Sequence, residues 1–227
     1  MSRDSKAIVL LSGGLDSAVA LWWAKRKGWV LYTITFNYFQ RHQREIESAE
    51  RLAKAAAVFE HKVIDVQYMK EIADSILLKE AAIDVQIKDR PAIYVPGRNT
   101  VFYGIAASWA ETIVAKWIIG GHNRLDFKQF PDSTPEYFAL FNRLLRIGTW
   151  AGRKHPIRIL TPLSKMDKRQ IVRLALKLGV PLELTWSCYM GRERACGTCE
   201  ACKIRLNAFK EAGVRDALEY EIPVSSG

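Results

Sequence analysis

The sequence predicts an α/β protein with a doubly wound parallel sheet and a small C-terminal segment in which four cysteines bind a metal. Two observations lead to this fold class. Apolar, β-branched runs alternate with helical patterns through the first 180 residues, and all four cysteines lie between residues 188 and 202. Such alternation is typical of parallel strands joined by right-handed helical crossovers. We expect residues 1–180 to form the α/β domain, and residues 181–227 to form the metal-binding segment and tail, packed on the same domain.

Five apolar runs predict the strands of this sheet, and five stretches with apolar residues at helical spacing predict helices between them. The expected strands are residues 7–11, 30–36, 62–66, 117–121 and 157–160, and the expected helices are residues 18–25, 44–57, 100–115, 136–147 and 168–178. Ser164 or Asp167 caps the last of these helices, and Gly179 ends it. Residues 79–98 are polar and contain two prolines. A loop of this length in a compact domain is usually functional or disordered.

The composition is that of a protein with a full apolar core and no membrane span. Of the 227 residues, 49% are hydrophobic and 26% are charged, and the longest apolar runs are far shorter than the roughly 18 residues of a membrane helix. The net charge is +10, but the basic residues are dispersed, so this charge alone does not indicate nucleic-acid binding. We expect no signal peptide and no secreted disulfide framework, and therefore a cytoplasmic protein.

The stretch Ser12-Gly13-Gly14-Leu15-Asp16-Ser17 joins the first expected strand to the first expected helix. Backbone N–H groups freed by the turn and the positive end of the helix dipole meet here, which favours a bound anion. Neither the Walker pattern nor the dinucleotide fingerprint is present. Asp16 beside phosphates is explained if Mg²⁺ bridges them. An ordinary turn with serine caps is the alternative, but the six residues together favour a phosphate site.

Three further features fall where an open parallel sheet binds its ligands, at the carboxyl ends of its strands. Residues 122–132 directly follow the fourth expected strand. Arg98 precedes the helix expected at residues 100–115, and Lys165 lies between the last expected strand and the last expected helix. Either cation suits a phosphate, although arginines and lysines at such positions are often simply exposed to solvent.

The cysteines Cys188, Cys196, Cys199 and Cys202 form the second strong motif. A Cys-x-x-Cys turn presents two thiolates to one ion, and four thiolates complete a closed tetrahedral site with no open position for catalysis. Zinc is favoured over an iron–sulfur cluster, because the fourth cysteine lies upstream and the Cys-Pro ending of a ferredoxin run is absent. We expect one structural zinc ion that holds residues 186–202. A bare zinc-knuckle nucleic-acid binder would leave the first 180 residues without a purpose.

The loop at Ser12–Ser17 resembles the PP-loop of the N-type ATP pyrophosphatases, which adenylate an acceptor oxygen and release pyrophosphate. Within that superfamily, the chain resembles the 7-cyano-7-deazaguanine (preQ0) synthase family over essentially its whole length. The motifs that carry this second resemblance are Asn37-Tyr38-Phe39-Gln40-Arg41-His42, Val95-Pro96-Gly97-Arg98-Asn99, Phe130-Pro131-Asp132, Thr185-Trp186-Ser187-Cys188-Tyr189 and the last three cysteines. In the segment 121–129, Asp126 matches the family pattern but the family's Ser-Gly pair is absent, and Ser133-Thr134 stands where the family usually has Cys-Arg.

The resemblance implies a ligase that converts 7-carboxy-7-deazaguanine, ATP and ammonia to 7-cyano-7-deazaguanine in queuosine or archaeosine biosynthesis. ATP would adenylate the carboxylate, and ammonia would displace AMP to give an amide. A second adenylation would then let AMP leave from the amide oxygen, which gives the nitrile. Free ammonia is expected because no cysteine remains for a glutaminase. A cytoplasmic homodimer is also implied, with no membrane contact and no stable nucleic-acid binding.

The same resemblance assigns roles to individual positions. The residues carried over as binding the ATP phosphates and Mg²⁺ are Leu11, Ser12, Gly13, Gly14, Leu15, Asp16 and Ser17. Arg98 and Lys165 are expected to assist with phosphate charge, and Asp132 to contact the deazaguanine or assist proton transfer. The four cysteines would hold the family's zinc.

Two other functions stay open from the residues alone. A PP-loop tRNA thiolase or lysidine-type synthetase would adenylate a base in tRNA and would bind tRNA in a salt-dependent way. A zinc-knuckle RNA-binding protein without enzymatic activity would bind RNA and release no pyrophosphate. In that second case, Asp16→Ala would leave binding unaltered.

Overall fold

In the computed structural model, the strands form one parallel sheet in the order β3-β2-β1-β4-β5. Their bounds are β1 (Lys6–Leu10), β2 (Val30–Asn37), β3 (Glu60–Asp65), β4 (Trp117–Ile119) and β5 (Arg158–Leu160). The structure describes residues 5–38, 44–66, 68–72, 94–190 and 193–221. Every neighbouring pair is parallel, and the strand order reverses between β1 and β4. The predicted doubly wound fold and all the predicted strands are therefore confirmed.

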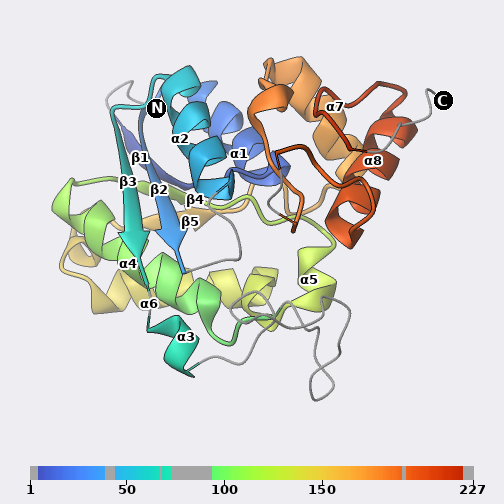
Figure 1. Cartoon of the computed structure of the whole chain (residues 1–227). Helices are drawn as coiled ribbons and strands as arrows, with labels where there is room; N and C mark the ends of the chain where they lie inside the picture. The colour runs from blue at the N-terminus through green and yellow to red at the C-terminus, as the bar shows by residue number, and fades with distance from the viewer. Residues whose placement is uncertain (1–4, 39–43, 67, 73–93, 191–192, 222–227) are drawn as a thin grey trace.

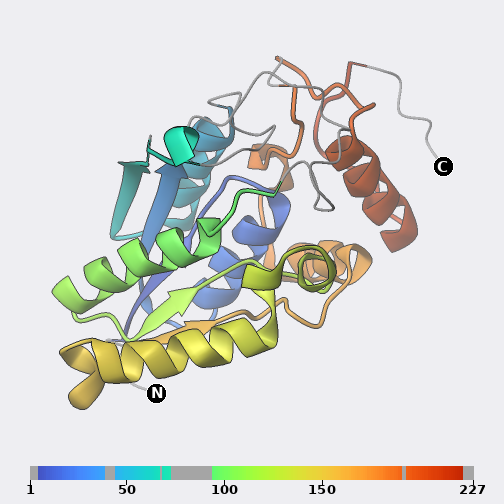
Figure 2. The ribbon, with the colours of Figure 1, turned by 90° about the horizontal axis from the view of Figure 1, so that it is seen from below.

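Helices cover both faces of the sheet (Figures 1 and 2). Their bounds are α1 (Leu15–Lys25), α2 (Arg44–Ala56), α3 (Met69–Ile72), α4 (Arg98–Thr112), α5 (Asp126–Gln129), α6 (Pro135–Gly148), α7 (Lys168–Leu178) and α8 (Glu200–Ala212). Buried residues of α1, α2, α7 and α8 share one apolar core, and those of α4 and α6 share the core on the opposite face. The side chains of β1 alternate between these cores, with Ala7 and Val9 in the first and Ile8 in the second.

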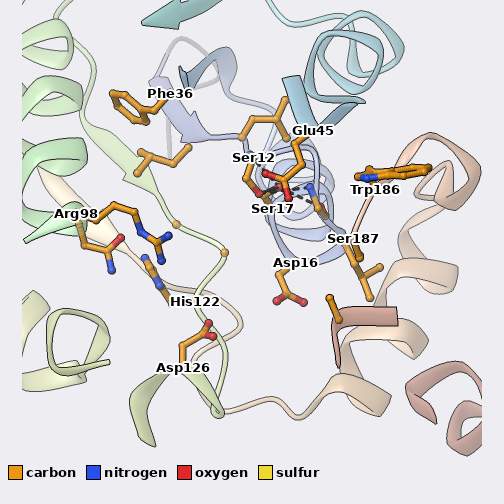
Figure 3. A pocket seen from close by; sticks show the side chains of 18 of the residues that line it. Ser12, Asp16, Ser17, Phe36, Glu45, Arg98, His122, Asp126, Trp186 and Ser187 are labelled. Atoms are coloured by element: carbon orange, nitrogen blue, oxygen red, sulfur yellow. Dashed lines mark hydrogen bonds between the residues drawn. The ribbon is translucent and has the colours of Figure 1, made fainter. Parts of the chain in front are cut away.

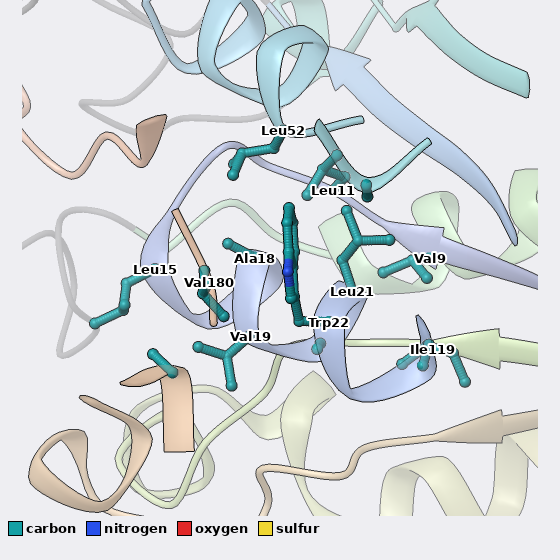
Figure 4. Packing of buried hydrophobic residues seen from close by; sticks show 14 of the residues in the cluster. Val9, Leu11, Leu15, Ala18, Val19, Leu21, Trp22, Leu52, Ile119 and Val180 are labelled. Atoms are coloured by element: carbon teal, nitrogen blue, oxygen red, sulfur yellow. The ribbon is translucent and has the colours of Figure 1, made fainter. Parts of the chain in front are cut away.

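Helix α1 lies at the centre of the first core and is buried on almost every side. In Figure 4, Leu21 and Trp22 of this helix lie among Leu11, Leu52 and Val180, which come from three other segments. A helix enclosed in this way needs apolar residues all round, and the sequence after Ser17 supplies them. The packing fixes the start of α1, and it thereby fixes the glycine loop that precedes it.

Helix α7 begins and ends where the sequence predicts. The Asp167 carboxylate accepts a hydrogen bond from the Gln170 backbone N–H at 2.8 Å, and the Gln170 side chain accepts one from the Asp167 N–H at 3.0 Å. Gly179 ends the helix with a left-handed φ of 69°. Of the two proposed caps, Asp167 is therefore the one used, and Ser164 is not.

Helix α8 is an element that the sequence reasoning missed. Its N-cap is Cys199, and its first turn contains Cys202, so the pattern interpreted only as a metal-binding turn is also the start of a helix. Ala208 and Phe209 of α8 enter the first core. The division of the chain at residue 180 stays a prediction.

Much of the loop predicted at residues 79–98 lies outside the described residues. Its last four described positions before α4 are 94–97, and Gly97 caps the helix with a left-handed φ of 68°. Within the described ranges, none of the helices combines the length and the apolar character that crossing a membrane requires.

Candidate active site

A cavity of about 440 Å³ opens at the carboxyl ends of the strands, around the point where the strand order reverses. Four parts of the chain form its wall: the glycine loop with the start of α1, the ends of β1 and β2 with α4, the segment after β4, and the cysteine segment with α8 (Figure 3). Its lining includes Ser12, Asp16, Ser17, Glu45, Arg98, His122, Asp126, Lys168, Trp186 and Tyr189. The glycine loop, Arg98 and the segment after β4 meet at this edge of the sheet, as predicted. The cysteine segment also reaches this edge, which was not predicted.

The glycine loop is closed by its own serines. Ser17 Oγ donates to the Gly14 carbonyl at 3.0 Å, Ser12 Oγ donates to Ser17 Oγ at 3.1 Å, and the Ser12 N–H donates to Ser17 Oγ at 3.2 Å. Gly14 is the N-cap of α1 and has no side chain to cap it. The first N–H groups of α1 therefore have no acceptor within the helix, and they lie at its positive end. This is the geometry of an anion site.

Gly13 cannot be replaced by a larger residue without moving α2. Its φ is +83°, and a Cβ atom there would collide with the backbone carbonyl of Glu45 and lie 3.1 Å from the Ala49 nitrogen. Gly121 meets a similar constraint after β4, because a Cβ there would lie 2.9 Å from the Ser17 nitrogen. The loop is thus packed between the first turn of α2 and the end of β4.

Asp16 has hydrogen-bond partners on one carboxylate oxygen and none among the described residues on the other. Its Oδ2 accepts hydrogen bonds from Lys168 Nζ at 2.6 Å and from Asn123 Nδ2 at 2.9 Å. Its Oδ1 is buried and has no hydrogen-bond partner among the described residues. Burial lowers the pKa of Lys168, but the Asp16 carboxylate more than offsets this and the pKa is raised. A carboxylate oxygen without a hydrogen-bond partner beside an anion site fits a divalent cation.

The segment after β4 places two more titratable groups in the wall. The Asp126 carboxylate accepts the Asn123 N–H at 2.9 Å, and its pKa is raised to about 6, first by burial and then by the nearby Asp16 charge. His122 Nε2 lies 2.9 Å from the Tyr103 hydroxyl, and burial together with Arg98 lowers the pKa of His122 to about 4. His122 is therefore a neutral imidazole near pH 7.

The structure brings together most of the predicted nucleotide-binding residues, but two predicted residues lie elsewhere. Arg98 and all of Leu11–Ser17 except Gly13 line the cavity. Lys165 is exposed and outside the lining. Asp132 is buried below the cavity, where its carboxylate accepts the Asn99 N–H at 3.1 Å near the start of α4. The roles given to both residues stay predictions that these positions do not support.

Lys168 is the cavity lysine that the sequence reasoning missed. It is the first residue of α7, directly after the Asp167 cap. The cap was recognised in the sequence, and a residue in the first turn of a helix at a strand's carboxyl edge faces the site. That signal could have selected Lys168 over Lys165, which precedes the cap.

The four cysteines lie together, as the sequence predicts. The sulfur atoms of Cys188, Cys196, Cys199 and Cys202 are all within 4.8 Å of one another. Backbone N–H groups point at them: the Cys196 N–H lies 3.3 Å from Cys188 Sγ, and the Cys199 N–H lies 3.3 Å from Cys196 Sγ. Such donors stabilise thiolates. The cluster is therefore able to bind a metal ion.

The cysteine segment is joined to the glycine loop by a hydrogen bond from the Trp186 N–H to the Gly13 carbonyl, 2.9 Å long. Arg205 of α8 also lines the cavity and holds this segment through hydrogen bonds. Its guanidinium donates to Thr185 Oγ1 at 2.7 Å and pairs with Asp216 at 2.7 and 2.9 Å. The sequence reasoning missed Arg205 and Asp216, since no spacing rule links a helical arginine to an acid beyond the helix.

One of the family-like motifs is partly outside the described residues. Of the motif at residues 37–42, only Asn37 and Tyr38 are described, and Asn37 Nδ2 donates to Asp65 at 2.6 Å. The Val95–Asn99 motif is described in full and forms the entry to α4.

Comparison with known proteins gives one consistent result. Residues 6–213 match the family model described as queuosine biosynthesis protein QueC. The 7-cyano-7-deazaguanine synthase of Thermoplasma acidophilum is 45% identical over 95% of this chain and 92% of the relative. The enzyme of the same name from Nostoc sp. is 43% identical over 95% of this chain and 97% of the relative.

Similarity to solved structures is at the level of the fold. A 4-thiouridine synthetase in complex with RNA and bound ATP has a TM-score of 0.54 at 19% identity, covering 92% of this chain and 50% of that one. An NMN synthetase from Francisella tularensis has a TM-score of 0.52 at 16% identity, covering 94% of this chain and 79% of that one. Both agree with the parallel α/β fold.

Proposed function

Because this chain belongs to the family of the queuosine biosynthesis protein QueC, we propose that it is a 7-cyano-7-deazaguanine synthase. It converts 7-carboxy-7-deazaguanine and ammonia to the nitrile with two molecules of ATP, each cleaved to AMP and pyrophosphate. The observation that carries this proposal is that one cavity is lined both by the anion site of the loop and by Asp16, whose Oδ1 has no hydrogen-bond partner among the described residues. Adenylation with release of pyrophosphate needs such a cavity, because the anion site can hold the pyrophosphate and the carboxylate can hold its magnesium ion.

Backbone N–H groups and two cationic side chains stabilise the negative charge of the phosphates in this proposal. The free N–H groups at the start of α1 bind the phosphates that leave as pyrophosphate, and their aligned dipoles stabilise the charge that develops on it. Arg98 adds a fixed positive charge on the α4 side, and Lys168 adds one on the α7 side while holding Asp16. Both adenylation rounds release the same leaving group, so one loop serves both.

Magnesium and zinc have separate places in this proposal. Mg²⁺ would be held by Asp16 together with ATP phosphate oxygens, where it would neutralise phosphate charge. One Zn²⁺ would be held by the four cysteines as a closed site, which supplies no catalytic position. The donor sets fit these ions, since thiolates select zinc and carboxylates select magnesium.

Free ammonia is the nitrogen source in this proposal. All four cysteines of the chain lie in the metal cluster, so none serves as the nucleophile of a glutaminase. The resemblance to the family also leads us to infer a cytoplasmic homodimer, whose mass light scattering would measure.

The decisive experiment supplies the purified protein with 7-carboxy-7-deazaguanine, ATP, Mg²⁺ and ammonium chloride. We expect a base of the mass of the nitrile, together with AMP and pyrophosphate in a ratio of about two per nitrile. Without ammonium, pyrophosphate release should stop after the first adenylation. ADP as the nucleotide product, or a base of unchanged mass, would contradict the proposal.

A further inference from the structure

Glu45 places a carboxyl group in the cavity wall beside the glycine loop. It belongs to the first turn of α2 and lines the same cavity as Ser12, Gly14 and Ser17. Its backbone carbonyl lies against Gly13, so close packing fixes α2 relative to the loop. In Figure 3 the Glu45 side chain extends from α2 toward the two serine hydroxyls. A group in this place faces the phosphates that the loop binds.

The loop's own hydroxyl protons are already used. Ser17 donates its proton to the Gly14 carbonyl, and Ser12 donates its proton to Ser17 Oγ. In this arrangement the loop presents backbone N–H groups to a phosphate, but no hydroxyl donor and no lysine. An additional hydrogen-bond donor from outside the loop would stabilise the departing pyrophosphate, whose negative charge grows as its bond to the α-phosphorus breaks.

The surroundings of Glu45 favour its neutral form. Burial raises the pKa of Glu45 to about 7, and the opposing effect of Arg98 on α4 does not cancel it. Among the described residues, Tyr38 at the end of β2 and Tyr189 in the cysteine segment are also close enough to interact with it. Bound pyrophosphate would raise the pKa further, since a carboxylate beside an anion is repelled. A neutral carboxylic acid, in contrast, donates a hydrogen bond.

We propose that Glu45 is a neutral acid that donates a hydrogen bond to the departing pyrophosphate in both adenylation rounds. The inference rests on the proposed function, because it takes pyrophosphate as the group held by the loop. As the substrate oxygen bonds to the α-phosphorus, the bond from that phosphorus to the bridging oxygen breaks. Its electron pair stays on pyrophosphate, where the Glu45 O–H meets the new charge. The proton stays on Glu45 when pyrophosphate leaves, so the group is ready for the second round.

The test compares the wild type with Glu45→Gln, which keeps a hydrogen-bond donor but cannot ionise. Adenylation is followed by pyrophosphate release in a first turnover without ammonia, from pH 6 to 9. In the wild type, kcat/KM for ATP should fall about tenfold per pH unit above about 7, because the free enzyme loses the acid form. Glu45→Gln should lack this decline and should be more active than the wild type at pH 9.

Glu47→Gln is the matched control, since Glu47 lies in the same turn of α2 and forms an exposed pair with Arg44 at 3.7 Å. It makes the same Glu-to-Gln change in the same helix turn, and its pH profile should follow the wild type. A second variant, Glu45→Ala, should lack the decline but be at least tenfold slower than Glu45→Gln at pH 6.5. Equal rates for these two variants, or an unchanged decline in Glu45→Gln, would overturn the proposal. So would a raised Mg²⁺ requirement in Glu45→Gln, which would identify Glu45 as a metal ligand.

A binding measurement separates this inference from the proposed function. Inorganic pyrophosphate with Mg²⁺ is titrated into each protein at pH 8 in buffers of different ionisation enthalpy. The wild type should take up close to one proton more per pyrophosphate than Glu45→Gln, and equal uptake would contradict the inference. This result does not depend on the deazaguanine substrate. If the wild type binds pyrophosphate with that extra proton yet makes no nitrile, only the proposed function fails.

Discussion

The two walls of the cavity are held in place by different forces. The glycine loop leads from β1 into α1, and both elements are buried in the large apolar core. The opposite wall, residues 186–205, has a much smaller apolar cluster, which consists of Trp186, Ala195 and three of the cysteines. Its helix α8 is anchored in the large core only farther along, by Ala208 and Phe209. The rest of the wall is held by backbone hydrogen bonds of Ala195, by the cysteine cluster and by the buried pair of Arg205 and Asp216.

This difference shows that one fold can combine a rigidly held binding loop with a cavity wall that opens without unfolding the sheet. A loop anchored in the main core opens only when the whole domain unfolds, whereas a wall with few apolar contacts opens at a lower free energy. The walls meet at the hydrogen bond from Trp186 to Gly13. Changes in the cysteine wall should therefore alter the cavity without unfolding the sheet, and changes in the loop should act on both.

The largest effect is expected on removing the metal from the cysteine cluster. Structural zinc contributes about 10–16 kcal/mol in isolated zinc-binding peptides, far more than this wall can replace with apolar contacts. A strong chelator under reducing conditions should abolish activity and expose the amides of residues 193–206 to hydrogen exchange. Strands β1 to β5 should keep their protection. Zinc should restore both signals, and simultaneous loss of protection in the sheet would contradict the comparison.

The next largest effect is expected for Asp216→Asn. The side chains of Arg205 and Asp216 are each 2% exposed, and removing one partner of a buried pair destabilises a protein by about 3–5 kcal/mol. Because Arg205 also holds Thr185, the variant should weaken metal retention as well as lower the urea midpoint.

Glu219→Gln is the control for this variant. The pair of Arg194 and Glu219 is 3.4 Å long but largely exposed, so its removal should change stability by about 0–1 kcal/mol. If both variants destabilise equally, the buried pair has no special part in holding the wall.

The two walls also differ in how much of their structure could be predicted from the sequence. The loop, its strand and its helix are local in sequence, so glycine spacing and an apolar run identify them together. Lys168 and Asp126 act from distant segments, and only the strand order places them beside Asp16. The role of Arg205 could not be predicted for another reason. An arginine on a helix is usually exposed, and the burial of Arg205 depends on Asp216, a partner 11 residues later in the chain. Helix α8 was hidden because its first turn shares residues with the cysteine motif.

Gly13→Ala should rank third. Alanine in the left-handed region costs about 1–2 kcal/mol, and the collision with the Glu45 carbonyl adds a similar amount or more. Since α2 must move away from the loop, activity should fall at least about 100-fold. Gly28→Ala is the control, because Gly28 has a similar φ of +70° but nothing within 4 Å of its Cβ position. It should lose only the conformational part of the stability and keep full activity.

The smallest effect distinguishes two lysines three residues apart. Lys168→Met removes the 2.6 Å contact to Asp16 and a positive charge from the cavity, so kcat/KM for ATP should fall about 10- to 100-fold, or roughly 1.4–2.7 kcal/mol. The fold should be unaffected, because methionine suits a helix as well as lysine does. Lys165→Met should change kcat/KM by less than about twofold, since the exposed Lys165 lies outside the cavity lining. Initial rates of pyrophosphate release at several ATP concentrations measure both variants. A larger loss in Lys165→Met than in Lys168→Met would mean that the segment before α7 closes over bound ATP, and that the original prediction for Lys165 was right.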